Sequence, residues 1–600
     1  MVTKKVEKNI GNINSNSNSN SNSNSNSNSN SNSNGNSNLN KEAFEFPMPT
    51  LKEFARDLNI GNQLIDPVAD WLRPWHRNHY TRILVVVDGT IAVNPTGFGI
   101  SSVIELIRGA AVGCMRFRVD IASRNGTTQS IVASPGIHDV KYLGFRFDMV
   151  DSGASVIDKY QQIWCFGFNP GGFDDANIDL ASQNPTNTNE LIKLASWMKD
   201  NKGGLFGTGD HEILGASMCR KIPRLGTMRR WTVASGVPTG GGTTRIDTLR
   251  PPSAAYEPGA PGQLALSNGA HQGDMTVQPI QWTAHKRSYR PFIWSSRPHP
   301  VLCHPTLGPI NVMPDHAHEG LCVEAADINL AAKYNFDGLG DKDEYPDAID
   351  GGAKPVPFMA AYGSNLGSPP YRFSKLDQPA RSHNPMINVY DGHRAGVGRV
   401  ATDSTWHHWM DVNINTIRAA NNDDWKKISR YFINLAVWLN PPGYSTHCFH
   451  LATVVSHFQT PGFQEYAADA SVRELGQSLR SHLIYTYGAC WVIERVWEVI
   501  WERKLWPFEL VREEPPRIDF GGIDPTILEE LVLGHMVKAT MKSAQTVKDA
   551  VIQGNLKSIE ALPEPEKLFD KPVRAALKEL AAGLEEHFAL GARAVKMMNQ

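Results

Sequence analysis

Cysteine is scarce in this 600-residue chain, and its few cysteines form no recognisable group. The seven cysteines lie far apart without a Cys-x-x-Cys pair, so their spacing offers neither a paired zinc-thiolate site nor a disulfide framework. The lysines near the N-terminus precede a polar repeat, not the apolar stretch that a signal peptide needs. We therefore expect reduced thiols and a cytoplasmic location.

A long apolar segment and an excess of positive charge are also missing. No run of about 18 apolar residues occurs, so no membrane-spanning helix is expected. The 59 basic residues do not outnumber the 61 acidic ones, whereas nucleic-acid-binding surfaces favour a basic excess. The sequence thus predicts neither a membrane nor a nucleic acid as partner.

The first 43 residues have a composition unlike that of the rest of the chain. Residues 14–38 alternate between asparagine and serine, with a single glycine at position 35. A tract without apolar groups cannot bury surface to offset the entropy cost of ordering. We interpret residues 1–43 as a disordered tail. Replication slippage explains such a repeat, although asparagine-rich tracts also self-associate.

Strand and helix patterns alternate over the next 400 residues. A continuous β-branched run such as residues 83–87, ending in Asp88-Gly89, is typical of a strand buried on both faces of a parallel sheet. Helical spacing follows at residues 101–108, 189–199, 213–219 and 424–439, and further strand patterns occur at 117–123, 142–147, 163–168, 205–208, 309–313, 386–390 and 398–402. Such alternation predicts an α/β fold with a mostly parallel sheet and helices on both faces.

Domain boundaries are expected where this pattern changes. Residues 44–440 are predicted to form the α/β domain, with a loop-rich insertion at 232–300. The segment Pro441-Pro-Gly443 is a natural boundary, and the pattern beyond it is helical. We expect a helical region at 441–515, with helical spacing of apolar residues at 478–504, and a helical tail at 516–600.

Three motifs together resemble one known family. They are the strand ending at Asp88, the sequence Gly-Gly-Leu-Phe-Gly-Thr-Gly-Asp-His-Glu at 203–212, and the late strand Gly-Arg-Val-Ala-Thr-Asp-Ser at 398–404. Their order is similar to that of class I glutamine amidotransferase-like domains, including the ThuA-like branch, over roughly residues 80–440. The resemblance implies a flavodoxin-like sheet and a nucleophile elbow at 207–211.

The elbow lacks the residue that carries glutaminase chemistry. True glutamine amidotransferases place a cysteine there, whereas this chain has Gly207-Thr-Gly-Asp-His211. The nearest cysteine, Cys219, falls within the helix expected to follow and cannot project from the turn toward a base. We therefore expect no glutaminase activity.

Three polar clusters contain the candidate site residues. The catalytic candidates, as acids, bases or nucleophile-activating groups, are Asp210, His211, Glu212, Glu319 and His407. The metal-ligand candidates, for a divalent metal such as zinc, are His316, His318 and His408. Imidazoles and carboxylates suit both roles, and a His-x-His pair faces one side of an extended segment.

Each cluster also has a simpler structural interpretation. Asp210 and Glu212 suit the first turn of a helix, where carboxylates cap and complement the dipole. His316 and His318 suit hydrogen bonds to a loop, and Trp406 and Trp409 suit packing. No His-Glu-x-x-His or other strong metal signature occurs.

The sequence thus predicts an amidotransferase-like protein with a thiol-free polar pocket. A hydrolase acting on a small polar substrate by acid-base or metal-assisted chemistry is the leading hypothesis. The alternative is a non-catalytic scaffold whose tryptophan-rich segment 491–506 docks a protein partner or a second copy. A metabolite sensor that signals through its C-terminal helices is a third alternative.

Overall fold

The computed structural model describes most of the chain after residue 78. The described residues are 79–88, 99–113, 115–125, 140–169, 179, 184–209, 214–232, 277–290, 293–314, 321–349, 351–363, 384–442, 469–502, 526–552 and 570–598. The chain divides into Met1–Glu42 and Ala43–Gln600, and every described residue belongs to the second unit. The predicted tail at 1–43 lies outside the described residues.

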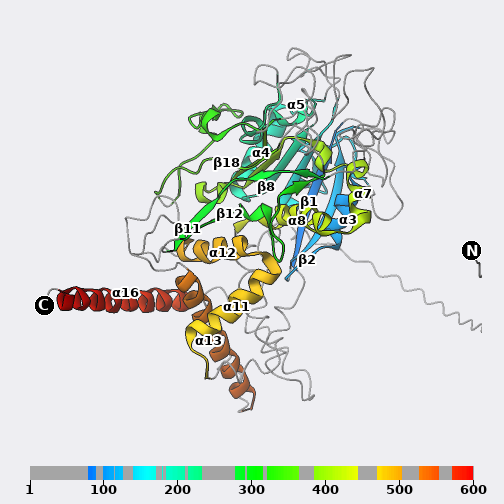
Figure 1. Ribbon diagram of the computed structural model, residues 1–600. Coiled ribbons are helices and arrows are strands. Elements are labelled where there is room, and N and C mark those ends of the chain that lie inside the picture. Colours follow the sequence, from blue (N-terminus) through cyan, green and yellow to red (C-terminus); the bar gives the residue numbers. More distant parts are fainter. Residues whose placement is uncertain are drawn as a thin grey trace, which may run out of the picture. The chain divides into compact units, whose positions relative to one another are not determined.

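A large mixed sheet with a parallel core organises the described residues (Figure 1). Five parallel strands form the core in the order β3-β1-β7-β8-β20, and their bounds are Met115–Ser123, His79–Val87, Gln162–Gly167, Gly204–Gly209 and Val400–Asp403. Antiparallel strands β19 (Asn384–Tyr390), β18 (Phe358–Gly363) and β10 (Gln281–Trp282) extend the sheet beyond β20. On the other side of β3, β4 (Val140–Tyr142) pairs with it in parallel and β2 (Ala111–Val112) pairs with it in antiparallel orientation.

Helices cover both faces because the core strands are apolar on both. In β1, Ile83, Val85 and Val87 belong to one hydrophobic cluster, whereas Leu84 and Val86 belong to the other. The first face packs against α3 (Ser101–Gly109), α7 (Asp411–Ala420) and α8 (Asp423–Trp438). The second packs against α4 (Thr188–Asp200), α5 (Ala216–Cys219) and α6 (Leu225–Met228). The predicted α/β class with helices on both faces is thus confirmed.

In the part of the chain that the structure describes, four helices follow the sheet. They are α11 (Val472–Tyr487), α12 (Ala489–Glu502), α13 (Thr526–Ile552) and α16 (Asp570–Met598). The helical spacing at 478–504 is divided between α11 and α12 at Gly488, which has a left-handed φ of 92°. Trp491 and Trp497, in the segment predicted to dock a partner, are buried, and Trp506 lies outside the described residues.

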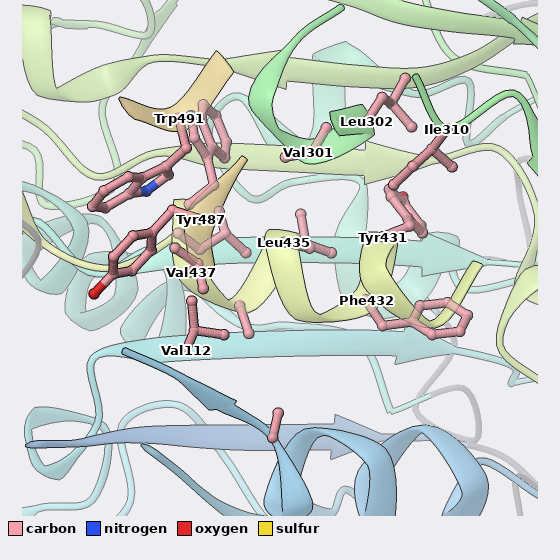
Figure 2. Close-up of a cluster of buried hydrophobic side chains, with 14 of the residues drawn as sticks. Val112, Val301, Leu302, Ile310, Tyr431, Phe432, Leu435, Val437, Tyr487 and Trp491 are labelled. Atoms are coloured by element: carbon pink, nitrogen blue, oxygen red, sulfur yellow. The ribbon is translucent and has the colours of Figure 1, made fainter. Parts of the chain in front are cut away.

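The sheet and these helices share one hydrophobic cluster. Figure 2 shows Tyr431, Phe432, Leu435 and Val437 of α8 beside Val301 and Leu302, with Tyr487 and Trp491 in the same cluster. The rings of Tyr487 and Trp491 are stacked, with centroids 4.1 Å apart. The segments on either side of Pro441 therefore bury their apolar residues together.

Short elements complete the described structure. The strands are β5 (Val150–Asp151), β6 (Ala154–Ser155), β9 (Gln278–Pro279), β11 (Lys286–Arg290), β12 (Ile293–Arg297), β13 (Cys303–His304), β14 (Gly308–Pro309), β15 (Val312–Met313), β16 (Lys333–Tyr334) and β17 (Lys342–Asp343). The 3-10 turns are η3 (Ile157–Lys159), η10 (Pro300–Leu302), η11 (Ala325–Asp327), η12 (Gly392–Ala395) and η13 (Trp406–His408). Among the described helices, none combines the length and apolar character needed to span a membrane.

Candidate functional site at the carboxyl edge of the sheet

The carboxyl ends of β1 and β7 meet where the strand order reverses. β1 pairs with β3 on one side and with β7 on the other, so consecutive parallel strands leave β1 in opposite directions. In open α/β sheets, ligands bind in the crevice outside the carboxyl ends of the strands at such a reversal. Asp88 follows the last residue of β1 at this point.

Asp88 is a buried carboxyl group with one satisfied oxygen. Its side chain accepts the backbone N–H of Phe168, and that of Asn169 at 2.9 Å, through Oδ1. Within the part of the chain that the structure describes, Oδ2 has no hydrogen-bond partner. Burial raises the pKa of Asp88 to about 6, although the Phe168 N–H and the charge of Arg124 act against this shift. A carboxyl group with such a pKa exchanges protons near neutral pH.

Arg229 ties together the ends of β8 and β20. Its guanidinium donates to the carbonyl oxygens of Gly209 at 2.9 Å, Asp403 at 3.0 Å and Ser404 at 2.9 Å. The Arg229 backbone also forms a β-bridge with Cys322, whose Sγ lies 3.4 Å from Thr402 Oγ1. Arg229 thereby holds the end of β8, the end of β20 and the segment at Cys322 together at one edge of the sheet.

Asp403 holds the side chains of the loop that follows β20. Its carboxylate lies 2.8 Å from Nδ1 of His408, and Trp409 Nε1 and Tyr431 Oη donate to it at 3.3 Å and 3.2 Å. Because a carboxylate only accepts, Nδ1 of His408 is the donor in this pair. Asp403 and His408 are both fully buried.

The same loop crosses the carboxyl edge toward α3. The ring of Trp406 packs edge-on against Phe168 at 4.9 Å, and the ring of His407 stacks on Trp406 at 4.3 Å. At the far end of the loop, Asp411 accepts the backbone N–H groups of Ser101 and Ser102 at the start of α3. The loop therefore places His407 one aromatic layer from Phe168, whose N–H binds Asp88.

Packing accounts for both tryptophans, as predicted. Trp409 lies among Trp164, Phe166 and Phe206, with its ring centroid 4.6 Å from that of Phe206. Trp406 and Trp409 are about 1% and 0% exposed. The neighbouring histidines are thus fixed in place by an aromatic core and not by solvent-exposed loop structure.

Six of the eight predicted site residues lie outside the described residues: Asp210, His211, Glu212, His316, His318 and Glu319. Their roles stay predictions. Gly209 and Cys322, which are described and lie close to them along the chain, are both anchored by Arg229. His407 and His408 are described, and the structure places His408 on a carboxylate and stacks the ring of His407 on Trp406. The predicted metal role of His408 likewise stays a prediction.

The described part of the helix expected at 213–219 is shorter than predicted. Within residues 214–219 it is present only as α5, Ala216–Cys219, preceded by Gly215 with a φ of 90°. A Cβ on Gly167 would lie 2.3 Å from Cα of Gly215, so the backbone at Gly215 packs directly against the end of β7. Cys219 is fully buried, and burial raises the pKa of its thiol well above the ordinary value. A buried thiol of this kind is a poor nucleophile.

Three residues of this edge were missed from the sequence: Asp88, Arg229 and Asp403. Two of them had a readable signal, because a single aspartate follows or ends each apolar strand pattern at 83–88 and 398–403. The sequence carries no such signal for Arg229, because an arginine in a polar segment is usually solvated.

Comparison with known proteins leaves the site to be interpreted from its own geometry. No protein-family model, no curated protein and no solved structure matches the chain.

Proposed function

We propose that this chain is a hydrolase acting on a small polar substrate at the carboxyl edge of its sheet, by acid-base chemistry without a thiol. The observation that carries the proposal is Asp88, a 2%-exposed carboxyl group at the strand reversal with a pKa raised to about 6 and an oxygen without a hydrogen-bond partner among the described residues. Strongly perturbed carboxyl groups concentrate at functional sites.

The strand order supports a ligand site beside the first strand. Numbered along the chain, the parallel strands β1, β3, β4, β7, β8 and β20 lie in the order 3-2-1-4-5-6. In doubly wound sheets of this order, ligands bind at the reversal beside the first strand. The amidotransferase-like assignment rests on the sequence motifs, and the proteins of that family use a cysteine, which this chain lacks at the elbow.

In this proposal, two side chains transfer protons. Asp88 serves as the general acid or base, because its pKa lies near neutral pH. His408 is the second proton carrier, and Asp403 positions it by accepting from Nδ1. Asp210, His211, Glu212, Glu319 and His407 remain candidate catalytic groups, and a divalent metal such as zinc remains a candidate cofactor for His316, His318 and His408.

Hydrolysis by the full chain tests the proposal. We would assay a panel of amides, esters and glycosides with the parent, Asp88→Asn and the control Asp158→Asn, which lies in η3 and pairs with Lys193. The amide introduced by Asp88→Asn keeps an oxygen for the two N–H groups, so the fold is retained. We expect a loss of roughly 10²-fold or more in kcat/KM for Asp88→Asn alone. Activity that is equal in both variants, or that shows no inflection near pH 6, contradicts an acid-base role for Asp88.

A further inference from the structure

A second group of polar side chains lies at the amino edge of the sheet, away from the candidate site. His285 precedes β11, His299 caps η10, and Glu494 lies on α12. Neighbouring Arg399 precedes β20 and donates to the carbonyl oxygen of Trp438 at the end of α8. The group therefore joins the loop-rich insertion to the C-terminal helices.

The three side chains are close enough to share one ion. One ligand atom from each of His285, His299 and Glu494 lies within 4.8 Å of the other two. His299 is 2% exposed and accepts the Val301 N–H through Nδ1, which leaves Nε2 for another ligand. The His285 and His299 rings meet edge to face at 4.7 Å. Two imidazoles and one carboxylate are a recurrent ligand set for zinc.

Two polar atoms of this group have no hydrogen bond. Within the described residues, neither Oε2 of Glu494 nor Nε2 of His285 has a hydrogen-bond partner, and both atoms are buried. Nε2 of His285 lies 3.9 Å from Oε1 of Glu494, which is beyond hydrogen-bond length. Buried polar atoms without partners are costly and point to a missing water or ion.

The two neighbouring arginines pair with the other carboxylates of this edge. Arg399 binds Asp391 at 2.9 Å and Glu498 at 2.7 Å, and Arg495 also binds Glu498 at 2.5 Å. In the described part of the chain, Glu494 makes no ion pair with either arginine. Its nearest cationic partner is His285, whose Nε2 lies 3.9 Å from Oε1.

We infer that His285, His299 and Glu494 bind one zinc-class divalent cation. The fourth tetrahedral position is left to water, because only three ligands converge among the described residues. The ion attaches the segment around β11 and η10 to α12, and its apolar surroundings include Phe358, 4.9 Å from the His285 ring, and Trp438, 4.9 Å from the His299 ring. This site is independent of the proposed hydrolase chemistry at the opposite edge.

Zinc content of the full chain provides the test. The purified protein would be loaded with zinc, passed through a desalting column with a weak chelator, and measured by elemental analysis and by thermal unfolding with and without zinc. The test variants are Glu494→Gln, which keeps the side-chain shape, and the partly exposed His285→Ala. The controls are His482→Ala, an exposed histidine on α11, and Cys490→Ser, which removes a soft ligand one helical turn from Glu494.

We expect one zinc per chain in the parent and in both controls, and at least about a tenfold loss of zinc affinity in Glu494→Gln and His285→Ala. Zinc should also raise the unfolding temperature of the parent but not of those two variants. The inference is overturned if the parent retains no zinc, or if Glu494→Gln and His285→Ala retain as much as the controls. Circular dichroism of the zinc-free variants separates ligand loss from misfolding.

Discussion

Burial disfavours the ionised forms of Asp88 and Asp391 alike, and an arginine beside Asp391 separates their outcomes. Among the described residues, Asp88 accepts hydrogen bonds from backbone N–H groups alone, so burial prevails and its pKa rises to about 6. Burial also disfavours ionised Asp391, but Arg399 at 2.9 Å overcomes it and holds the pKa well below the usual range. The first carboxyl group is suited to proton transfer and the second to a permanent ion pair.

Replacing Asp88 with asparagine should stabilise the protein at high pH. The pKa of Asp88 rises from 3.8 to about 6 on folding, so the folded state binds this proton more tightly. The resulting stabilisation is present below pH 3.8 and is lost as the pH rises through about 6. About 1.4 kcal/mol per pKa unit sets an upper bound of about 3 kcal/mol for the gain of Asp88→Asn above pH 6.

Urea unfolding of the parent and Asp88→Asn at several pH values would measure this difference. The two curves should converge toward acid pH and separate as the pH rises. Asp158→Asn, the surface control, should follow the parent throughout. A constant difference between parent and Asp88→Asn at all pH values contradicts the raised pKa.

Replacing Asp403 with asparagine should destabilise the protein at neutral pH. The carboxylate accepts from His408, Trp409 and Tyr431, whereas an amide offers one acceptor and turns its NH₂ group toward donors. We expect a loss of roughly 1–3 kcal/mol in the free energy of unfolding, the cost of leaving buried donors unsatisfied. The partly exposed Glu105→Gln, which removes a surface pair with Arg418, should change stability by less than about 1 kcal/mol. Equal effects in the two variants contradict this account.

Residue spacing explains which site residues the sequence could indicate. Asp88 and Asp403 end local strand patterns, so a short window of sequence locates them. The grouping of His285, His299 and Glu494 depends on α12 packing beside η10, and no local pattern encodes that contact. The sequence-predicted clusters are rich in histidine and acidic residues, but the local density of such residues does not indicate which of them are buried or paired.

At the scale of elements, apolar runs were the most informative signal. The patterns at 83–87, 163–168 and 205–208 correspond to β1, β7 and β8, because strands buried on both faces need continuous apolar sequence. The run at 309–313 is divided between β14 and β15, which pair outside the main sheet. The break at Gly488 was missed because apolar spacing continues across it, while its left-handed φ depends on tertiary contacts.

Glycines set the approach of α11 to α13, and Gly476→Ala should separate them. A Cβ at Gly476 would lie 1.7 Å from the carbonyl oxygen of Glu530, a backbone atom that cannot rotate away. We expect a loss of roughly 1–3 kcal/mol in the free energy of unfolding, typical of overpacking. A Cβ added at the exposed Gly583 of α16 would meet nothing within 4 Å. Gly583→Ala should therefore leave stability unchanged or raise it by up to about 1 kcal/mol.

Thermal and denaturant unfolding of both glycine variants would distinguish packing from helix propensity. Helix propensity favours alanine over glycine at both positions. Opposite changes in the free energy of unfolding are therefore expected only from the close contact between position 476 and Glu530. Stabilisation by Gly476→Ala would show that α11 and α13 lie further apart than described.

At the scale of the whole molecule, the sequence indicates a domain boundary, but one hydrophobic cluster contains residues from both sides of it. Pro441-Pro-Gly443 separates an alternating α/β pattern from a helical one. Yet Leu435 of α8 and Leu475 of α11 belong to one buried cluster together with residues of β1 and β7. Composition reports local changes along the chain, whereas a shared core depends on which apolar faces meet after folding.

This shared core predicts cooperative unfolding across the apparent boundary. Leu435 and Leu475 are both fully buried, so Leu435→Ala and Leu475→Ala should each cost roughly 2–5 kcal/mol through lost burial and a residual cavity. Leu590→Ala, at a 55%-exposed position on α16, is the matched control and should cost little. Because one cluster joins both segments, each buried variant should move a single transition, and tryptophan fluorescence and helical circular dichroism should report the same midpoint. Two separate transitions, with Leu435→Ala shifting one and Leu475→Ala the other, would show that the sheet and the C-terminal helices fold independently, since a common core requires both segments to lose their packing at once.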